Sequence, residues 1–541
     1  MQNMKKNILI HSVAAAIALV GAVGCADSWD DHYGEQRVVS DKSLLQLIEE
    51  QPDLSDFLRV LRATHIYNNN RITKVTYADL LAGDQSLTVW APRNGTFNVD
   101  SLLQECSTQS GDSMCSAHFT ANHIARYIHG SLEASDARYK LLNGKYAVVS
   151  DGKFGGSAYA LGRADQPAKN GLLHVIDGET PFNYTIYEAL LTMPDMKHVG
   201  DFFSSYNRYE LDEEASIQCG LVDGMKVYSD SVMRLRNVLY NVFGQINAED
   251  SNYVFLMPTE QVWNRVYAEA LTHFNYGSAS KADSLQRYWA TRSIIADLVY
   301  NRNLNRTALK DSVVSTSHVS WDKDLRKYHV FYKPLEPGGL FSTQVIRDSL
   351  ACCNGKVFFL RDWPFTAEQN YFFPVKTESE NTNLINEYKD CTYNVREAQA
   401  DTISNGYLDI TPKSSTSNWV LNLRVPNVLS GTYDICAVIL PKTAQNPNSR
   451  DYKPNKFTAS IDYEGLDGTM QSQAFEGDFT NNPREVDTVC VGRCNIPVCS
   501  YGQPAANVYV TLTCNIGKRE TTYSRNMYLD CLYFKPVTTE E

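Results

Sequence analysis

The sequence predicts an α+β protein of three domains, in which two related α+β domains precede an all-β sandwich. A strand that ends in a proline occurs twice, at Pro92 and Pro258, and each copy is followed by a second strand behind an Asn-Gly pair. The wide spacing indicates a duplicated domain and not a short solenoid repeat. The last third has alternating apolar runs without a long helical pattern. A length of 541 residues fits three domains of about 100 to 200 residues each.

The N-terminus predicts a signal peptide over residues 1–24. Lys5 and Lys6 precede the apolar stretch 8–23, and small residues precede Cys25. The uninterrupted apolar part is shorter than the roughly 20 residues that a transmembrane helix needs. The sequence therefore predicts export.

The segment Ala-Val-Gly-Cys, residues 22–25, resembles the lipobox of bacterial lipoproteins, although Ala22 stands where that family usually has leucine. The resemblance implies that Cys25 is acylated and becomes the first residue of the mature protein. Its partner would then be outer-membrane lipid. Several acyl chains anchor a protein stably because each buried methylene contributes about 0.8 kcal/mol. The alternative is an ordinary secretory signal in which Cys25 is incidental.

Residues 25–37 predict an acidic tether that contains Asp27, Asp30 and Asp31. These acids resemble the export signal by which some Gram-negative anaerobes send lipoproteins to the outer leaflet of the outer membrane. The resemblance implies a lipid-anchored outer-membrane protein that faces the cell exterior. A solvated tether that needs no receptor is the alternative.

The first domain, residues 38–182, is expected to open on an amphipathic helix. Apolar residues from Leu54 to Leu61 recur on one helical face, and Asp53 is the expected N-cap. The segment LTVWAPRNGTF, residues 87–97, predicts a strand stopped by a proline. The segment NGLLHVIDG, residues 170–178, predicts a strand between two tight turns.

The second domain, residues 183–375, repeats these elements as NYVFLMPTEQVW, residues 252–263, and NGKVFFLRDWPF, residues 354–365. The first-copy segments TVWAPRNGTF and NGLLHVIDG resemble the two conserved boxes of the fasciclin (FAS1) family. The resemblance implies a tandem pair of compact α+β wedges and a role in cell adhesion. The second copy is divergent and carries extra sequence around residues 208–227.

His123 matches the central histidine of the fasciclin family, with Asn122 where tyrosine is common. Alignment of IARYIH with IADLVY places Ile294 at the equivalent position of the second copy. A histidine that isoleucine can replace is expected to be a core residue and not a receptor contact.

The polar segment 374–384 predicts a linker into the third domain, residues 385–541. In NWVLNLRVP the apolar residues alternate with other residues, which predicts a half-buried strand, and several similar strands indicate an all-β sandwich. Asp530 and Pro536 in the last strand are similar to the final strand of galactose-binding-like modules, which implies carbohydrate binding. This domain is expected to fold alone.

The composition excludes one partner class and argues against several kinds of chemistry. The formal net charge is −12, and removal of the two leader lysines makes it −14, so the basic surface of a nucleic-acid binder is missing. Phosphate-loop, nucleophile-elbow, metal-helix and EF-hand motifs do not occur. We therefore expect no enzyme activity, no cofactor and no metal site. An acidic turn is the expected reading of Asp462, Glu464 and Asp467, with calcium binding as the alternative.

The cysteines leave their pairing open. The group Cys490, Cys494 and Cys499 contains no C-x-x-C pair, which argues against zinc. Three other cysteines fall within strand-like runs, where each could be a buried thiol or part of a disulfide. They are Cys436, Cys514 and Cys531.

The sequence as a whole predicts a non-catalytic cell-surface lipoprotein for adhesion or ligand capture, accessory to an outer-membrane transporter of glycan or peptide. The ligand would be a glycan or an extracellular protein. A surface glycoside hydrolase or other hydrolase with its site in the third domain is one alternative, and a structural spacer is another. The rings proposed to face outward and contact ligand are Tyr407, Trp419, Tyr452, Tyr463 and Tyr501, with core packing as the default alternative for Trp419.

Overall fold

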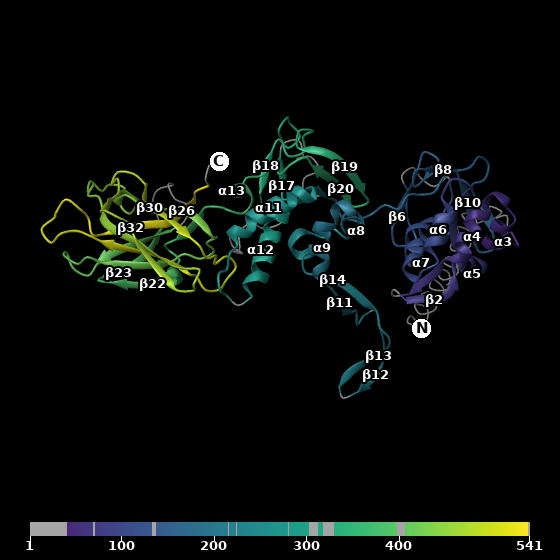
Figure 1. The fold of residues 1–541 in the computed structure, drawn as a ribbon, viewed down its shortest axis with the longest axis horizontal. Coiled ribbons are helices and arrows are strands. Elements are labelled where there is room, and N and C mark those ends of the chain that lie inside the picture. Colours follow the sequence, from purple (N-terminus) through teal and green to yellow (C-terminus); the bar gives the residue numbers. More distant parts are fainter. Residues whose placement is uncertain are drawn as a thin grey trace, which may run out of the picture. The chain divides into compact units, whose positions relative to one another are not determined.

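The computed structural model describes most of the chain from residue 40 to residue 538, and its elements can be followed in Figure 1. The chain divides into two compact units, Met1–Asn183 with Leu211–Met233 and Tyr184–Glu210 with Arg234–Glu541. Each unit has its own apolar core. The described ranges are 40–68, 71–131, 137–214, 216–222, 224–279, 281–301, 312–316, 329–397 and 406–538.

Two short helices open the first unit. Ser43 caps α3 (Leu44–Glu49) in a reciprocal capping box with Gln46, and the sequence analysis missed this helix. The predicted amphipathic helix is confirmed as α4 (Ser55–Ala63), whose inner face buries Phe57 and Leu61.

The predicted N-cap at Asp53 is wrong. Asp53 lies inside the 3-10 turn η1 (Pro52–Leu54), and its carboxylate accepts a hydrogen bond from Arg163 Nη2 over 3.0 Å. This bond lowers the pKa of the carboxyl. A long-range ion pair has therefore replaced the local cap.

The first sheet has the strand order β4-β3-β10-β9. The two predicted strands are its central parallel pair, β3 (Leu87–Pro92) and β10 (Gly171–Ile176). Asn170, ahead of β10, accepts from Leu44 N and donates to Leu81 O and Gly83 O over 2.6 to 2.9 Å. The Asn-Gly pair therefore fastens α3 to the sheet instead of making a hairpin turn.

The first unit contains further elements, which include the outer strands β4 and β9 of this sheet. They are β1 (His65–Asn68), β2 (Arg71–Thr76), α5 (Tyr77–Ala82), α6 (Val99–Glu105), α7 (Gln109–Cys115), the π-turn η2 (Ser116–Thr120), η3 (Ala121–His123), β4 (Ile124–Arg126), β5 (Ala137–Lys140), β6 (Tyr146–Ser150), β7 (Lys153–Phe154), β8 (Ser157–Ala158), β9 (Gln166–Ala168) and the hairpin of β12 (Ile217–Val222) and β13 (Met225–Asp230).

His123 is a core residue, as predicted. Its side chain is fully buried, Nδ1 donates to Phe119 O over 2.8 Å and Nε2 accepts from Thr180 N over 2.9 Å. Burial lowers the pKa of the imidazole to about 4, so the ring is neutral at neutral pH. Both ring nitrogens are used within the protein, which leaves none for a receptor.

The second unit contains a sheet with the equivalent order β16-β15-β20-β19, which confirms the duplication. Its central strands, β15 (Tyr253–Met257) and β20 (Gly355–Leu360), are again parallel. Asn354 repeats the contacts of Asn170, because it accepts from Ile186 N and donates to Ile246 O and Ala248 O. A side chain at Gly355 would place Cβ 1.9 Å from Tyr253 O, so glycine is required there.

The predicted equivalence of His123 and Ile294 is wrong by one helical turn. The register places Leu87 and Tyr253 at matching positions, and it makes Leu298 the counterpart of His123. Ile294 lies in α12 (Ala282–Ala296). The dipeptide Ile-Ala lies in strand β4 of the first copy and at the end of helix α12 in the second copy. Matching these two dipeptides caused the shift. Leu298 is fully buried, so the position is apolar core in the second copy.

The other elements of the second copy are helices and strands, and they include β16 and β19, the outer strands of the sheet. They are α8 (Ile186–Thr192), η4 (Pro194–Met196), α9 (Lys197–Ser205), β11 (Asn207–Leu211), β14 (Met233–Asn237), α10 (Tyr240–Phe243), α11 (Glu260–His273), β16 (Val299–Asn301), β17 (Ser312–Val314), β18 (Val330–Tyr332), β19 (Ile346–Cys352) and α13 (Ala367–Asn370).

The predicted sandwich is present as two six-stranded antiparallel sheets. One sheet contains β21 (Val375–Glu378), β23 (Cys391–Glu397), β24 (Gly406–Pro412), β26 (Gly431–Ile439), β30 (Asp487–Ile496) and β32 (Met527–Pro536). The other contains β22 (Ile385–Lys389), β25 (Val420–Arg424), β27 (Lys456–Glu464), β28 (Met470–Ala474), β29 (Phe479–Thr480) and β31 (Val508–Cys514).

The predicted linker is wrong over its first half, because β21 pairs with β32. A polar sequence can form such an edge strand when alternate side chains, here Val375 and Thr377, turn inward. The sandwich also shares its core with the preceding helices, since Tyr276 Oη donates to Tyr501 O over 2.9 Å. A fragment of residues 385–541 would lose β21 and expose these contacts, and its independent folding stays a prediction.

The cysteines of the sandwich divide into both expected classes. Cys436 and Cys490 form a disulfide between β26 and β30. Cys514 and Cys531 are buried thiols. Spacing along the chain could not identify this pair, since the disulfide joins neighbours across two strands.

Candidate ligand-binding site

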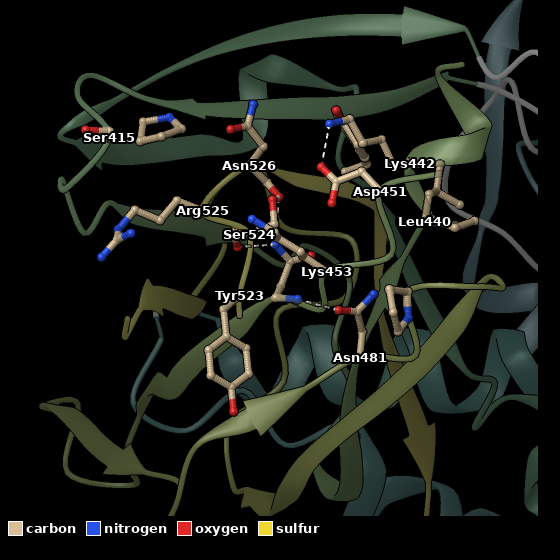
Figure 2. A pocket seen from close by; sticks show the side chains of 15 residues that line it. Ser415, Leu440, Lys442, Asp451, Lys453, Asn481, Tyr523, Ser524, Arg525 and Asn526 are labelled. Carbon is tan, nitrogen blue, oxygen red and sulfur yellow. Dashed lines mark hydrogen bonds and ion pairs between the residues drawn. The ribbon is translucent and has the colours of Figure 1, made fainter. Parts of the chain in front are cut away.

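A polar pocket of about 310 Å³ lies at one rim of the sandwich, where loops from both sheets meet (Figure 2). Four loops line it: those after β24, between β26 and β27, between β29 and β30, and before β32. The lining residues are Pro412, Ser415, Leu440, Pro441, Lys442, Asp451, Lys453, Asn455, Asn481, Pro483, Tyr523, Ser524, Arg525, Asn526 and Tyr528.

A buried amide holds three of these loops together. Asn455 N donates to Asn481 Oδ1 over 2.7 Å, a bond drawn in Figure 2, and Asn455 Nδ2 donates to the carbonyls of Ser524 and Asn526 over 2.8 and 2.7 Å. Asn455 and Asn481 are both buried. Buried polar groups with satisfied hydrogen bonds fix local geometry, so the pocket is pre-organised on this side.

Trp419 supports the same loop from the core. Its side chain is 1 % exposed, and its indole Nε1 donates to Arg525 O over 2.6 Å. The guanidinium of Arg525 in turn donates from Nη2 to Ile516 O and Gly517 O over 2.8 and 3.0 Å. Residues 523–526 are therefore held at both backbone and side chain.

Tyr407 lies beneath the pocket. It is fully buried and packs edge to face on Tyr528, with ring centroids 5.6 Å apart. Tyr528 lines the pocket and donates from Oη to Gln445 Oε1 over 2.8 Å. Burial raises the pKa of Tyr528 to about 12, so it stays a neutral hydrogen-bonding group.

The predicted set of outward-facing rings is wrong for Tyr407 and Trp419, because both fill the core. Tyr501 is partly buried and packs on Trp289 and Phe274. Alternation along a strand predicts which residues share a face but not which loops cover that face.

Two of the predicted rings stay at the surface of the sandwich. Tyr463 is half-buried on β27, and Tyr452 is exposed and lies under the Arg484 guanidinium at 4.3 Å. Tyr452 stands between two lining residues and stays a prediction as a ligand contact. The lining residues Asn481, Ser524 and Asn526 were missed, since polar loop residues show no periodic signal.

The pocket carries charges of both signs. Lys442 Nζ lies 2.8 Å from Asp451 Oδ2, and this hydrogen bond lowers the pKa of the Asp451 carboxyl. Lys453 is exposed, and its ammonium makes no ion pair with another residue in the described ranges. The arrangement can donate and accept hydrogen bonds over several neighbouring positions. It holds one carboxylate among the described residues that line it.

In the acidic segment 462–467, Asp462 and Glu464 lie in β27, and Asp467 lies in the turn that follows. Asp467 Oδ1 accepts from Thr469 N and Oγ1 over 3.0 and 2.8 Å, and Glu464 Oε2 accepts from Asn507 Nδ2 over 3.3 Å. Protein donors therefore occupy two of the three carboxylates that the calcium alternative requires, which favours the acidic-turn reading.

A second acidic group joins β21 to β32. Ligand atoms of Glu378, Asp530 and Cys531 lie within 4.8 Å of one another and could hold a metal ion. Lys376 Nζ stands 2.9 Å from Glu378 Oε1 and 3.7 Å from Asp530 Oδ2. The lysine supplies a positive charge to these carboxylates. Glu378 escaped sequence analysis because its segment was taken for a linker.

The predicted anchor and export residues, Cys25, Asp27, Asp30 and Asp31, lie outside the described residues. Within the described part of the chain, no helix combines the length and the apolar character that crossing a membrane requires.

Comparison with known proteins finds no matching family model and no matching curated protein. Among solved structures, a FAS1 domain pair of the insect cell adhesion molecule fasciclin I is similar over 53% of this chain and 90% of that chain, at 13% identity and a TM-score of 0.19.

Two structures that include CBM22 modules are similar over a smaller part of the chain. One comprises the CBM22-1 and GH10 modules of a Clostridium thermocellum endo-1,4-β-D-xylanase, with 31% of this chain and 29% of that chain covered, 11% identity and a TM-score of 0.22. The other is the CBM22-1 xylan-binding domain of a Paenibacillus barcinonensis protein, with 31% and 96% covered, 10% identity and a TM-score of 0.21. None of these likenesses assigns a family, an activity or a ligand to this chain.

Proposed function

We propose that this protein is a non-catalytic, lipid-anchored surface protein that captures glycan in the rim pocket of its C-terminal sandwich. The observation that carries the proposal is the polar 310 Å³ pocket, held rigid by Asn455 and Trp419. A sugar presents many hydroxyl groups, each a donor and an acceptor. A site that binds one needs several polar groups fixed in place, since pre-organisation lowers the entropic cost of binding.

The charge set of the pocket favours capture over hydrolysis. Glycoside hydrolysis by the usual mechanism needs two carboxyl groups about 5 to 9.5 Å apart around the scissile bond. Among the described residues of the lining, Asp451 is the one carboxylate, and Lys442 holds it in its ionised form. A general acid would need the opposite shift.

The proposal for the remaining domains and for the lipid anchor rests on the amino-acid sequence. Residues 38–182 and 183–375 would serve as a fasciclin-like stalk on an outer-membrane lipid anchor, and the sandwich would present its ligand to an outer-membrane transporter. Adhesion to an extracellular protein is the other use that the stalk allows.

Removal of the Lys442–Asp451 pair is expected to weaken glycan binding about tenfold or more, because two polar groups of the lining disappear together. The double variant Lys442→Ala/Asp451→Ala keeps the net charge. Exposed ion pairs contribute about 0 to 1 kcal/mol to stability, so the fold should survive. Calorimetry with xylohexaose, the ligand named for one of the similar modules, and with a panel of other plant oligosaccharides measures the change.

The control is Lys197→Ala/Asp201→Ala, which removes a more exposed pair of 2.7 Å on α9 and also keeps the net charge. This variant should bind as the wild type does. Equal binding by both double variants, or no binding of any glycan by the wild type, would contradict the proposal.

Replacement of Asp27, Asp30 and Asp31 by alanine is expected to leave acylation intact and to reduce surface display, since the acids would direct export only after the lipid is attached. Protease accessibility on whole cells measures display, and metabolic labelling with fatty acid checks acylation. Unchanged accessibility would mean that the acids are only a tether.

A further inference from the structure

The pocket is positively charged, although the whole chain is acidic. Four charged side chains line it, and three of them, Lys442, Lys453 and Arg525, are cations. The whole chain has a formal charge of −12. Screening limits charge effects to about 8 to 10 Å at physiological ionic strength, so a ligand in the pocket responds mainly to these local groups.

The single acid of the lining is already neutralised. Asp451 accepts a charge-assisted hydrogen bond from Lys442 at 2.8 Å, and the two lie together on one wall in Figure 2. Lys453 also acts electrostatically on Asp451, but neither Lys453 nor Arg525 lies within ion-pair distance of a carboxylate among the described lining residues.

Those two cations differ in how they are held. Arg525 donates to two backbone carbonyls, which orient the guanidinium without cancelling its charge. The nearby acid Glu520 is bound to Lys456 at 2.8 Å. The exposed Lys453 side chain is free to meet a ligand. A fixed guanidinium and an exposed ammonium together suit an anion better than a neutral polyol.

We propose that the pocket prefers an anionic sugar, one that carries a carboxylate or a sulfate, over its neutral counterpart. The inference rests on the proposed glycan capture and names the ligand class of that site. Lys453 acts as a specificity-determining residue, since its ammonium pairs with the acidic group while the neutral lining binds the hydroxyls.

The test compares oligogalacturonate, its neutral methyl ester and a sulfated galactan oligosaccharide by calorimetry on the full mature chain at low and moderate salt. We expect at least one anionic sugar to bind about tenfold or more tightly than the ester, with an affinity that falls as salt rises. Lys453→Glu should remove that advantage, so that the anionic sugars bind no more tightly than the ester does. The two anionic arms distinguish carboxylate from sulfate.

Lys535→Glu is the matched control, because it makes the same charge change at an exposed position at the far end of β32. Equal loss in both variants would attribute the effect to overall charge and overturn the inference. Equal binding of the anionic sugars and the ester would also overturn it, yet would leave glycan capture standing. Absence of binding to every glycan tested here and in the neutral panel would instead contradict the proposed function.

Discussion

Replacing Trp419 with alanine is expected to lower the free energy of unfolding of the sandwich by about 3 to 5 kcal/mol. The side chain is buried, and removal of a core tryptophan loses its apolar contacts and leaves a cavity. The change also leaves Arg525 O without the indole donor that now lies 2.6 Å away. Urea denaturation followed by circular dichroism measures the shift.

Tyr452→Ala is the control for this variant, because it removes a ring that is 38 % exposed from the same domain. Its effect on the free energy of unfolding should stay below about 1 kcal/mol. A Trp419→Ala variant that unfolds as the wild type does but no longer binds glycan would show that the ring contacts ligand and is not a core support.

Replacing Cys25 with alanine is expected to abolish acylation and release the protein from membranes completely. Stable anchoring requires acyl chains, whose buried methylenes each contribute about 0.8 kcal/mol. The sequence offers Cys25, behind its small residues, as their attachment point. Fractionation and mass spectrometry of the mature N-terminus measure the result.

Cys219→Ala, at an exposed cysteine outside the leader, should leave both acylation and membrane association intact. Persistent membrane association of Cys25→Ala would reveal a second anchor, and an unmodified cysteine in the wild type would favour the ordinary secretory signal.

The repeated sheet could be predicted because its determinants are local. Pro92 and Pro258 end buried strands, and each Asn-Gly pair precedes the parallel partner. The role of Asn170 and Asn354 was misread, since a side chain that bridges a helix and two carbonyls looks the same in sequence as a turn residue. The alignment that paired Ile294 with His123 was wrong by one helical turn. A single sequence does not show where one copy has residues that the other lacks.

The rim pocket could not be predicted from the sequence. Its lining comes from four loops between residues 412 and 528, and loops carry no periodic pattern that would mark a common site. The core position of Trp419, which the sequence offered as the alternative to ligand contact, did not reveal that its indole holds Arg525. The lining residues come together only when both sheets have formed.

Hydrogen exchange of the full mature chain with and without bound oligosaccharide tests capture by the sandwich most directly. Protection is expected in the loops 440–455, 481–483 and 523–528, with the glycan recovered uncleaved. Protection confined to residues 40–182, or the appearance of new reducing ends, would contradict the assignment of glycan capture to this pocket.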